Sequence, residues 1–232
     1  MIKAVIFDLD GTLLNRDASV EEFIEKQYDR WGKFLHHIPR RKYMERFIAL
    51  DHRGYVWKDI VYQKMIDELS IKGLTWEDLL QDYSDYFIDS CVPFPHLKDM
   101  LEELKHDHFH IGIITNGKGQ FQMDNIKALG IHHYTDTILI SDWEGVKKPD
   151  PLIFQRAADS LDVSIQECVF IGDHPEKDVK AAKDTGMKGV WKRDDEWSGV
   201  EADAVVDDLC AIPRLIQQMN TTLQIQEKSR SM

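Results

Sequence analysis

The sequence contains few cysteines and no long apolar run. Its cysteines, Cys91, Cys168 and Cys210, lie far apart and form no Cys-x-x-Cys pair, so we expect reduced and mostly buried thiols. The longest apolar runs fall far short of the ~20 residues that cross a bilayer. Met1 also leads directly into an apolar stretch, which predicts no signal peptide, no membrane partner and a cytoplasmic location.

Positive charge is scarce as well. The chain has 29 Lys and Arg against 41 Asp and Glu, a formal net charge of -12. A protein with no cationic excess binds nucleic acid poorly, but it can still hold a small phosphate through a local lysine and a metal ion. The hydrophobic fraction of 43% excludes disorder, and 232 residues suit one domain or a core with a smaller insert.

Apolar runs and helical patterns alternate from about residue 92 onward, after one apolar run near the start of the chain. The apolar runs predict strands at 4–7, 110–114, 137–140, 168–171, 189–191 and 204–206. The helical patterns cover 96–106, 121–129, 151–161, 175–185 and 209–219. Such alternation implies an α/β fold with a mainly parallel sheet that is covered on both faces.

The segment between about residues 18 and 90 contains no convincing strand. Its apolar stripes predict four helices, at 21–34, 41–50, 56–69 and 75–87. This is too long for a crossover between two strands, which commonly needs only one helix, so we interpret it as an inserted helical unit. Beyond the last predicted helix, residues 220–232 are polar, and we expect them to form a flexible tail.

Two carboxylates follow the first predicted strand. Asp8 and Asp10 stand two residues apart where the apolar run ends, and Gly11 allows the chain to turn. Open α/β sheets place their sites at the carboxyl ends of strands. Two acids there repel each other and need a cation or a shared proton. Taken alone, however, this pattern indicates no more than a polar strand end closed by a turn.

Three more polar segments occur in order along the second half of the chain. They are Thr115-Asn116-Gly117, Lys147-Lys148-Pro149 and Gly172-Asp173 with Asp178 five residues further on. With all four segments, the chain resembles the haloacid dehalogenase-like (HAD) hydrolases, most of all the phosphatases with an inserted helical cap. The resemblance extends from Met1 to about Met219. It implies a Rossmann-like, three-layer core at 1–15 and 92–219 and an all-helical cap at 16–91.

The resemblance also implies catalytic roles. Asp8 would attack phosphorus and form an aspartyl phosphate. Asp10 would protonate the leaving group and then activate the water that hydrolyses the intermediate. Lys148 would neutralise the nucleophile and the transferring phosphoryl oxygens. Lys147 competes for this role, and the resemblance favours Lys148 because the family lysine directly precedes the proline.

A magnesium ion is implied in the same way. Asp8 and Asp173 would bind Mg²⁺ through their side chains and Asp10 through its backbone carbonyl, because Mg²⁺ prefers a few carboxylates together with water and phosphate oxygens. Asp178 would order a metal-bound water or hold Lys148. Without the resemblance, we would interpret these acids as solvated residues at strand and helix ends.

The phosphate itself would be held by the segment after the second core strand. Thr115 would donate its hydroxyl to a phosphate oxygen, and Asn116 and Gly117 would offer backbone N–H groups. A Thr-Asn-Gly turn after a strand is common, so this is the least specific of the four segments.

The sequence therefore predicts a Mg²⁺-dependent phosphatase for a small metabolite: a nucleotide, phosphoglycolate or a sugar phosphate.

Three alternative functions stay open. A phosphosugar mutase uses the same four segments. A 2-haloacid dehalogenase needs neither metal nor leaving-group acid, so Asp10 and Asp173 speak against it. A catalytically silent binding protein would lack one of the acids, and none is missing. The substrate and the oligomeric state are left open by the pattern.

Overall fold

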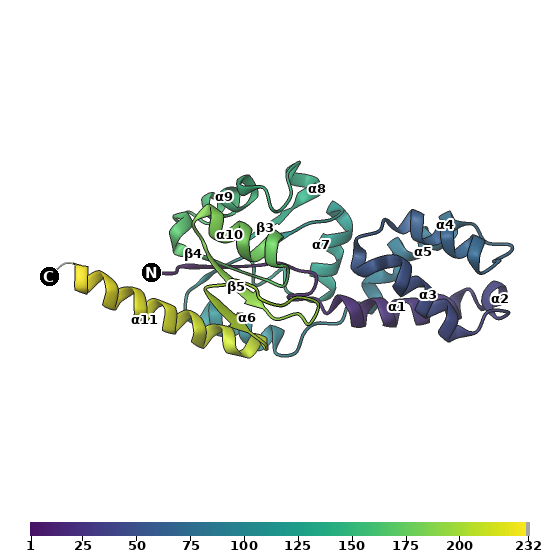
Figure 1. Ribbon diagram of the computed structural model, residues 1–232, viewed down its shortest axis with the longest axis horizontal. Helices are drawn as coiled ribbons and strands as arrows, with labels where there is room; N and C mark the ends of the chain where they lie inside the picture. The colour runs from purple at the N-terminus through teal and green to yellow at the C-terminus, as the bar shows by residue number, and fades with distance from the viewer. Residues whose placement is uncertain (231–232) are drawn as a thin grey trace. The chain divides into compact units, whose positions relative to one another are not determined.

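A six-stranded parallel sheet forms the centre of the structure. The computed structural model describes residues 1–230 (Figure 1). The strands are β1 (Ala4–Phe7), β2 (His110–Thr115), β3 (Thr137–Ile140), β4 (Cys168–Gly172), β5 (Lys188–Lys192) and β6 (Ala204–Val206). They are ordered β3-β2-β1-β4-β5-β6, and each neighbouring pair is parallel. Because β1 pairs on both sides, all four of its residues are buried, as its unbroken apolar run requires.

Helices cover both faces of this sheet. They are α6 (Leu97–His106), α7 (Gly119–Ala128), α8 (Ser141–Glu144), α9 (Pro151–Ser160), α10 (Ala181–Thr185) and α11 (Ile212–Arg230), with short helical turns at Ile165–Glu167, Pro175–Lys180 and Leu209–Ala211. α9 and α10 pack over the face that carries Ala4, Ile6 and Phe170, while α6 and α11 lie on the other face (Figure 1). The predicted three-layer α/β fold is confirmed.

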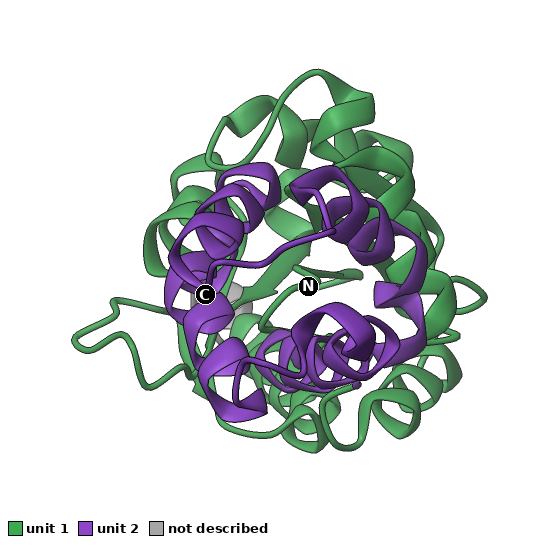
Figure 2. Cartoon of the chain, turned by 90° about the vertical axis from the view of Figure 1, so that its right-hand side faces the viewer, with its two compact units in different colours: residues 1–14, 93–232 green, residues 15–92 purple. Residues whose placement is uncertain are grey.

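The chain divides into two compact units, which Figure 2 shows in different colours. The sheet and its helices, Met1–Leu14 and everything from Pro93, form the first unit, and Asn15–Val92 forms the second. The second unit is entirely helical: α1 (Arg16–Arg30), α2 (Gly32–Leu35), α3 (Arg40–Asp51), α4 (Lys58–Glu68), α5 (Trp76–Tyr86), and short turns at His52–Gly54 and Phe87–Ser90. Within residues 1–230, no helix is long and apolar enough to cross a membrane.

The interior of the helical unit contains one polar hub among aromatic rings. Gln27 is fully buried, and its Oε1 accepts hydrogen bonds from the hydroxyls of Tyr43 (3.0 Å) and Tyr62 (3.1 Å). Its Nε2 donates to Asp82 Oδ2 (2.9 Å) and to the carbonyl of Leu79 (3.1 Å). Since each polar atom of the amide is satisfied, the hub joins α1, α3, α4 and α5 without an unpaired buried group.

The predicted ends of two helices were wrong. The first helix begins at Arg16 rather than residue 21, because the Asn15 side chain accepts the Ala18 N–H (3.2 Å) and caps it. The last helix does not end at Met219 but continues to Arg230. Asn220, just past the predicted end, anchors this helix beside β1: its Oδ1 accepts the N–H of Ile2 (2.5 Å) and its Nδ2 donates to the Ile2 carbonyl (3.1 Å). Residues 231 and 232 of the expected tail lie outside the described residues.

Candidate active site

Asp8 lies at the carboxyl edge of the sheet, directly after β1. Its N–H donates to the carbonyl of Ile171 in β4 (2.9 Å), which extends the strand pairing by one residue and fixes where the side chain starts. The chain then turns at Gly11, which has φ of +86°. A Cβ there would stand 2.6 Å from Asp173 Oδ2, so only glycine allows the turn and Asp173 to approach each other this closely.

Lys148 connects two carboxylates at this edge. Its Nζ lies 2.6 Å from Asp8 Oδ1 and 2.7 Å from Asp178 Oδ1, and the residue is only 3% exposed. Burial alone would lower the pKa of Lys148, but Asp178 and Asp8 together raise it above its ordinary value, so the ammonium stays charged. Lys147, the competing candidate, is exposed.

Asn116 fixes the backbone that carries Lys148. Asn116 Oδ1 accepts the N–H of Lys148 (2.9 Å), and Asn116 Nδ2 donates to the Lys148 carbonyl (2.9 Å). The neighbouring Gly117 N–H donates to Ser141 Oγ at the start of α8 (3.0 Å). Two residues of the segment expected to bind phosphate, Asn116 and Gly117, are thus held by hydrogen bonds to other parts of the protein. For Gly117, a phosphate contact would have to share or replace the bond to Ser141.

Gln122 in α7 connects two further predicted site residues, and it is only 2% exposed. Its Nε2 lies 2.6 Å from Asp10 Oδ2 and 2.6 Å from Thr115 Oγ1, so one amide nitrogen donates to both. Its Oε1 accepts from Asn125 Nδ2 (3.3 Å), which fixes which end of the amide faces Asp10. Because Thr115 Oγ1 is an acceptor in this pair, its own hydroxyl hydrogen is available to another partner.

Three acidic side chains converge at the edge between β1 and β4. Asp8, Asp173 and Asp178 each offer an oxygen, and these oxygens lie within 4.8 Å of one another. Burial and the charge of Asp178 raise the pKa of Asp173 to about 7. Burial likewise raises the pKa of Asp8 well above its usual range, against the opposing effect of Lys148. Three carboxyl groups share one lysine, so their ionised forms are disfavoured without a further cation, and their hard oxygen donors suit a divalent ion such as Mg²⁺.

Two further features of the site, at Trp191 and Gly172, were not predicted from the four sequence segments. Trp191 in β5 donates its Nε1–H to the carbonyl of Asp173 (2.8 Å) and so holds the backbone of this residue. A Cβ at Gly172 would stand 2.5 Å from Asp178 Cβ, so this glycine lets Asp178 approach the strand. For Gln122, the only sequence signal is its position in the first turn of the helix after Gly117.

The model of one protein family, haloacid dehalogenase-like hydrolase, matches residues 5–192, most of the chain. The chain belongs to the haloacid dehalogenase-like hydrolases. Related proteins align with it over most of its length. A glyceraldehyde 3-phosphate phosphatase of Pyrococcus abyssi is 34% identical over 211 residues, 82% of this chain and 81% of the relative. Its namesake from Pyrococcus furiosus is 26% identical over 245 residues, 94% and 95% of the two chains.

Solved HAD structures agree with this fold. A crystal structure of a HAD phosphatase from Thermococcus onnurineus superimposes with a TM-score of 0.66 at 27% identity and covers 93% of this chain and 98% of its own. YfnB of Bacillus subtilis, at 19% identity, shows the same fold with a TM-score of 0.73 over 92% and 98% of the chains. The predicted family and enzyme class, a HAD hydrolase acting on phosphoric monoesters, are therefore confirmed.

Proposed function

We propose that this HAD phosphatase is Mg²⁺-dependent and hydrolyses a small phosphorylated metabolite through an aspartyl phosphate on Asp8. One observation carries the proposal: a buried lysine joins Asp8 to Asp178 at 2.6 and 2.7 Å, with Asp173 in the same group of oxygens. A carboxylate nucleophile needs an adjacent cation to approach a phosphate dianion, and this lysine supplies part of that charge.

In this proposal Asp8 is the nucleophile and Lys148 its positioning cation. The Nζ of Lys148 fixes the rotation of the Asp8 carboxylate and remains charged next to the phosphoryl oxygens during transfer. Asp178 holds the other side of the ammonium, and Asn116 holds the Lys148 backbone, so the cation is already in place before substrate arrives.

Asp10 is the general acid and base. The Gln122 amide occupies Asp10 Oδ2, which leaves Oδ1 as the oxygen that gives the proton to the leaving alkoxide and later takes one from water. The same amide nitrogen donates to Thr115 Oγ1, so the Thr115 hydroxyl can donate its hydrogen to a phosphate oxygen. We propose that the Asn116 N–H also faces the phosphate.

The side chains of Asp8 and Asp173 and the carbonyl of Asp10 would hold Mg²⁺. When bound, the ion neutralises charge on the phosphate and on the carboxylates. The grouping of Asp8, Asp173 and Asp178 oxygens within 4.8 Å supports this assignment. Asp178 already contacts Lys148, so we assign it to the lysine and to a water rather than to direct metal binding.

The names of the relatives point to a substrate class. Glyceraldehyde 3-phosphate, in the two archaeal names, and phosphoserine, in that of a Thermus thermophilus relative, are both phosphate esters of primary alcohols. We propose a substrate of this kind.

We also propose that residues 15–92 form a cap that selects the leaving group, because this segment leaves the core at Leu14 and returns at Pro93. A β-bridge joins Leu14 to Asp10, and another joins it to Pro93.

The first test is metal removal. In excess EDTA, release of inorganic phosphate from a panel of phosphorylated primary alcohols should fall to background, because the converging acids would repel a phosphate dianion. Addition of Mg²⁺ should restore it, whereas Asp173→Asn should need far more Mg²⁺ for half-maximal activity. Undiminished turnover in the chelator would refute the metal-dependent mechanism.

A second test addresses Gln122. Gln122→Leu removes the donor to Asp10 and Thr115, so kcat should fall about 10–100-fold, a part of the ~10²–10⁴-fold that acid–base catalysis contributes. The loss should be larger for an alkyl phosphate than for an aryl phosphate, whose leaving group needs less protonation. Gln120→Leu is the matched control on the same helix, since Gln120 is exposed and its side-chain amide donates to Asp124, outside the site. Equal losses for both leaving groups would contradict the role.

A further inference from the structure

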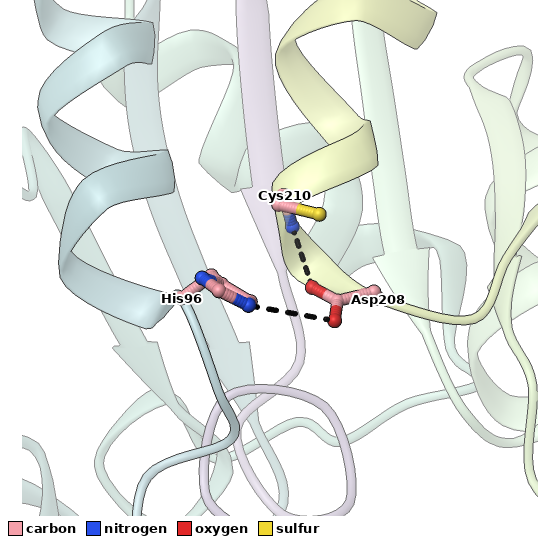
Figure 3. Close-up of side chains that lie close together, drawn as sticks. All are labelled: His96, Asp208 and Cys210. Atoms are coloured by element: carbon pink, nitrogen blue, oxygen red, sulfur yellow. Dashed lines mark hydrogen bonds and ion pairs between the residues drawn. The ribbon is translucent and has the colours of Figure 1, made fainter.

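A second group of side chains with metal-binding atoms lies in the first unit, apart from the three acids of the active site. His96 stands at the start of α6, and Asp208 and Cys210 belong to the turn between β6 and α11 (Figure 3). One donor atom from each, a nitrogen, an oxygen and a sulfur, lies within 4.8 Å of the others. We call these three residues the His–Asp–Cys cluster. Nothing in the proposed phosphatase mechanism uses them.

The imidazole of His96 is held between two carboxylates. Its Nε2 lies 3.8 Å from Asp208 Oδ2, and its Nδ1 lies 4.0 Å from Asp99 Oδ2. Both separations are too long for hydrogen bonds. Two ligands on one tetrahedral Zn²⁺, with bonds of about 2.0–2.2 Å, stand roughly 3.3–3.5 Å apart, so a 3.8 Å gap is close to one that an ion would span. Asp99 is placed to orient the second ring nitrogen, as outer carboxylates do at zinc sites.

The backbone at His96 determines where its ring lies. His96 has φ of +62°, a left-handed conformation that costs a non-glycine residue on the order of 1 kcal/mol. The conformation starts α6 and presents the ring to the turn that contains Asp208 (Figure 3).

Asp208 and Cys210 are arranged by the turn itself. The Cys210 N–H donates to Asp208 Oδ1 (2.9 Å), so Oδ2 is the oxygen that faces His96. Cys210 is exposed, whereas Cys168 is buried and Cys91 partly so, and the prediction of mostly buried thiols was therefore wrong.

We propose that His96, Asp208 and Cys210 bind one transition-metal ion, with Zn²⁺ as the ion that the donor set fits best. Imidazole and thiolate donors select zinc over magnesium, whereas the all-carboxylate group around Asp173 has the opposite preference. Three protein ligands leave the fourth tetrahedral position to water, which the exposure of the cluster allows. The ion would tie the start of α6 to the turn before α11.

Cobalt(II) provides a direct test, because Co²⁺ replaces Zn²⁺ and absorbs by charge transfer when a thiolate binds it. The full chain is titrated with Co²⁺ in excess Mg²⁺. We expect one equivalent to bind with thiolate absorption that Zn²⁺ abolishes by displacement. Cys210→Ser should remove this absorption, and His96→Ala should weaken Co²⁺ binding at least about tenfold. Both residues are exposed, so circular dichroism and the melting temperature in EDTA should match those of the parent protein.

Two controls make the result specific. Cys91→Ser removes a thiol outside the cluster and should leave the absorption unchanged. Asp173→Asn disables the proposed magnesium site and should also leave it unchanged, so the outcome does not depend on the phosphatase mechanism. The proposal is overturned by Co²⁺ binding without thiolate absorption, by absorption that survives Cys210→Ser, or by absorption that is lost in Cys91→Ser.

Discussion

Asp8→Asn is expected to abolish all turnover, whereas Asp10→Asn is expected to keep the first chemical step. The two carboxylates have different tasks in the proposed mechanism, although only Leu9 separates them. Asparagine at position 8 has no nucleophilic oxygen, so no phosphoenzyme can form. Asparagine at position 10 keeps the backbone carbonyl, and its side-chain oxygen can still accept the Gln122 amide, but it cannot transfer a proton.

The substrate decides how much activity Asp10→Asn retains. With an alkyl phosphate, the variant should lose about 10²–10⁴-fold, the usual contribution of acid–base catalysis. With an activated aryl phosphate, the leaving group departs without a proton, so the first step should largely survive. Phosphate release should then be slow because the attacking water lacks its base.

Rapid mixing with the aryl phosphate measures both effects. Asp10→Asn should give a burst of aryl alcohol close to one per enzyme, followed by slow turnover, and Asp8→Asn should give no burst. The opposite pattern, a burst in Asp8→Asn and none in Asp10→Asn, would show that the two roles are interchanged. Circular dichroism spectra of both variants serve as the folding control.

Lys148→Met should lower kcat about 10³-fold. Methionine fills a similar volume but removes the charge that lies 2.6 Å from Asp8 and 2.7 Å from Asp178. Removing a single preorganised donor at a site of charge development costs roughly 10²–10³-fold, and this lysine also neutralises the nucleophile in the ground state. The effect should appear mainly in kcat, because the charge is needed most during phosphoryl transfer.

Lys147→Met is the matched control for this variant. It makes the same change one residue earlier, at an exposed side chain, so kcat should stay within about twofold of the parent. Removing one partner of a buried ion pair is also destabilising by about 3–5 kcal/mol. Activity is therefore compared at a temperature where thermal melts show Lys148→Met to be folded. If the two variants lose activity equally there, the assignment of Lys148 fails.

The sequence predicted the sheet well because strands and helices leave local patterns. The central strand is an unbroken apolar run, and the alternation that follows it gave the parallel topology. The ends of the first and last helices were missed for different reasons. Asn15 is a local cap that the sequence does display. The bonds between Asn220 and Ile2 join residues 218 positions apart, and no local pattern encodes them.

The active site shows the same division. Asp8, Asp10 and Asp173 follow strand ends, and parallel strands bring their carboxyl ends to one edge of the sheet. The choice of Lys148 over Lys147 came from the family resemblance. The side chains that orient these acids and this lysine could not be predicted from the sequence. Asn116 was expected to present its backbone to phosphate, and its side chain also holds the Lys148 backbone. Gln122 carries no motif, since its hydrogen bond to Asp10 depends on how α7 returns to the sheet.

The central place of β1 has a consequence for synthesis of the chain. β1 is translated first, but its neighbours β2 and β4 begin only at His110 and Cys168. Residues 15–92 emerge between them as one contiguous unit whose contacts are local, so they can fold while β1 still has two open edges. An apolar strand without partners is a segment that chaperones bind. Asp8 thus leaves the ribosome before the other residues of the site and reaches its final position only after β4 has been made.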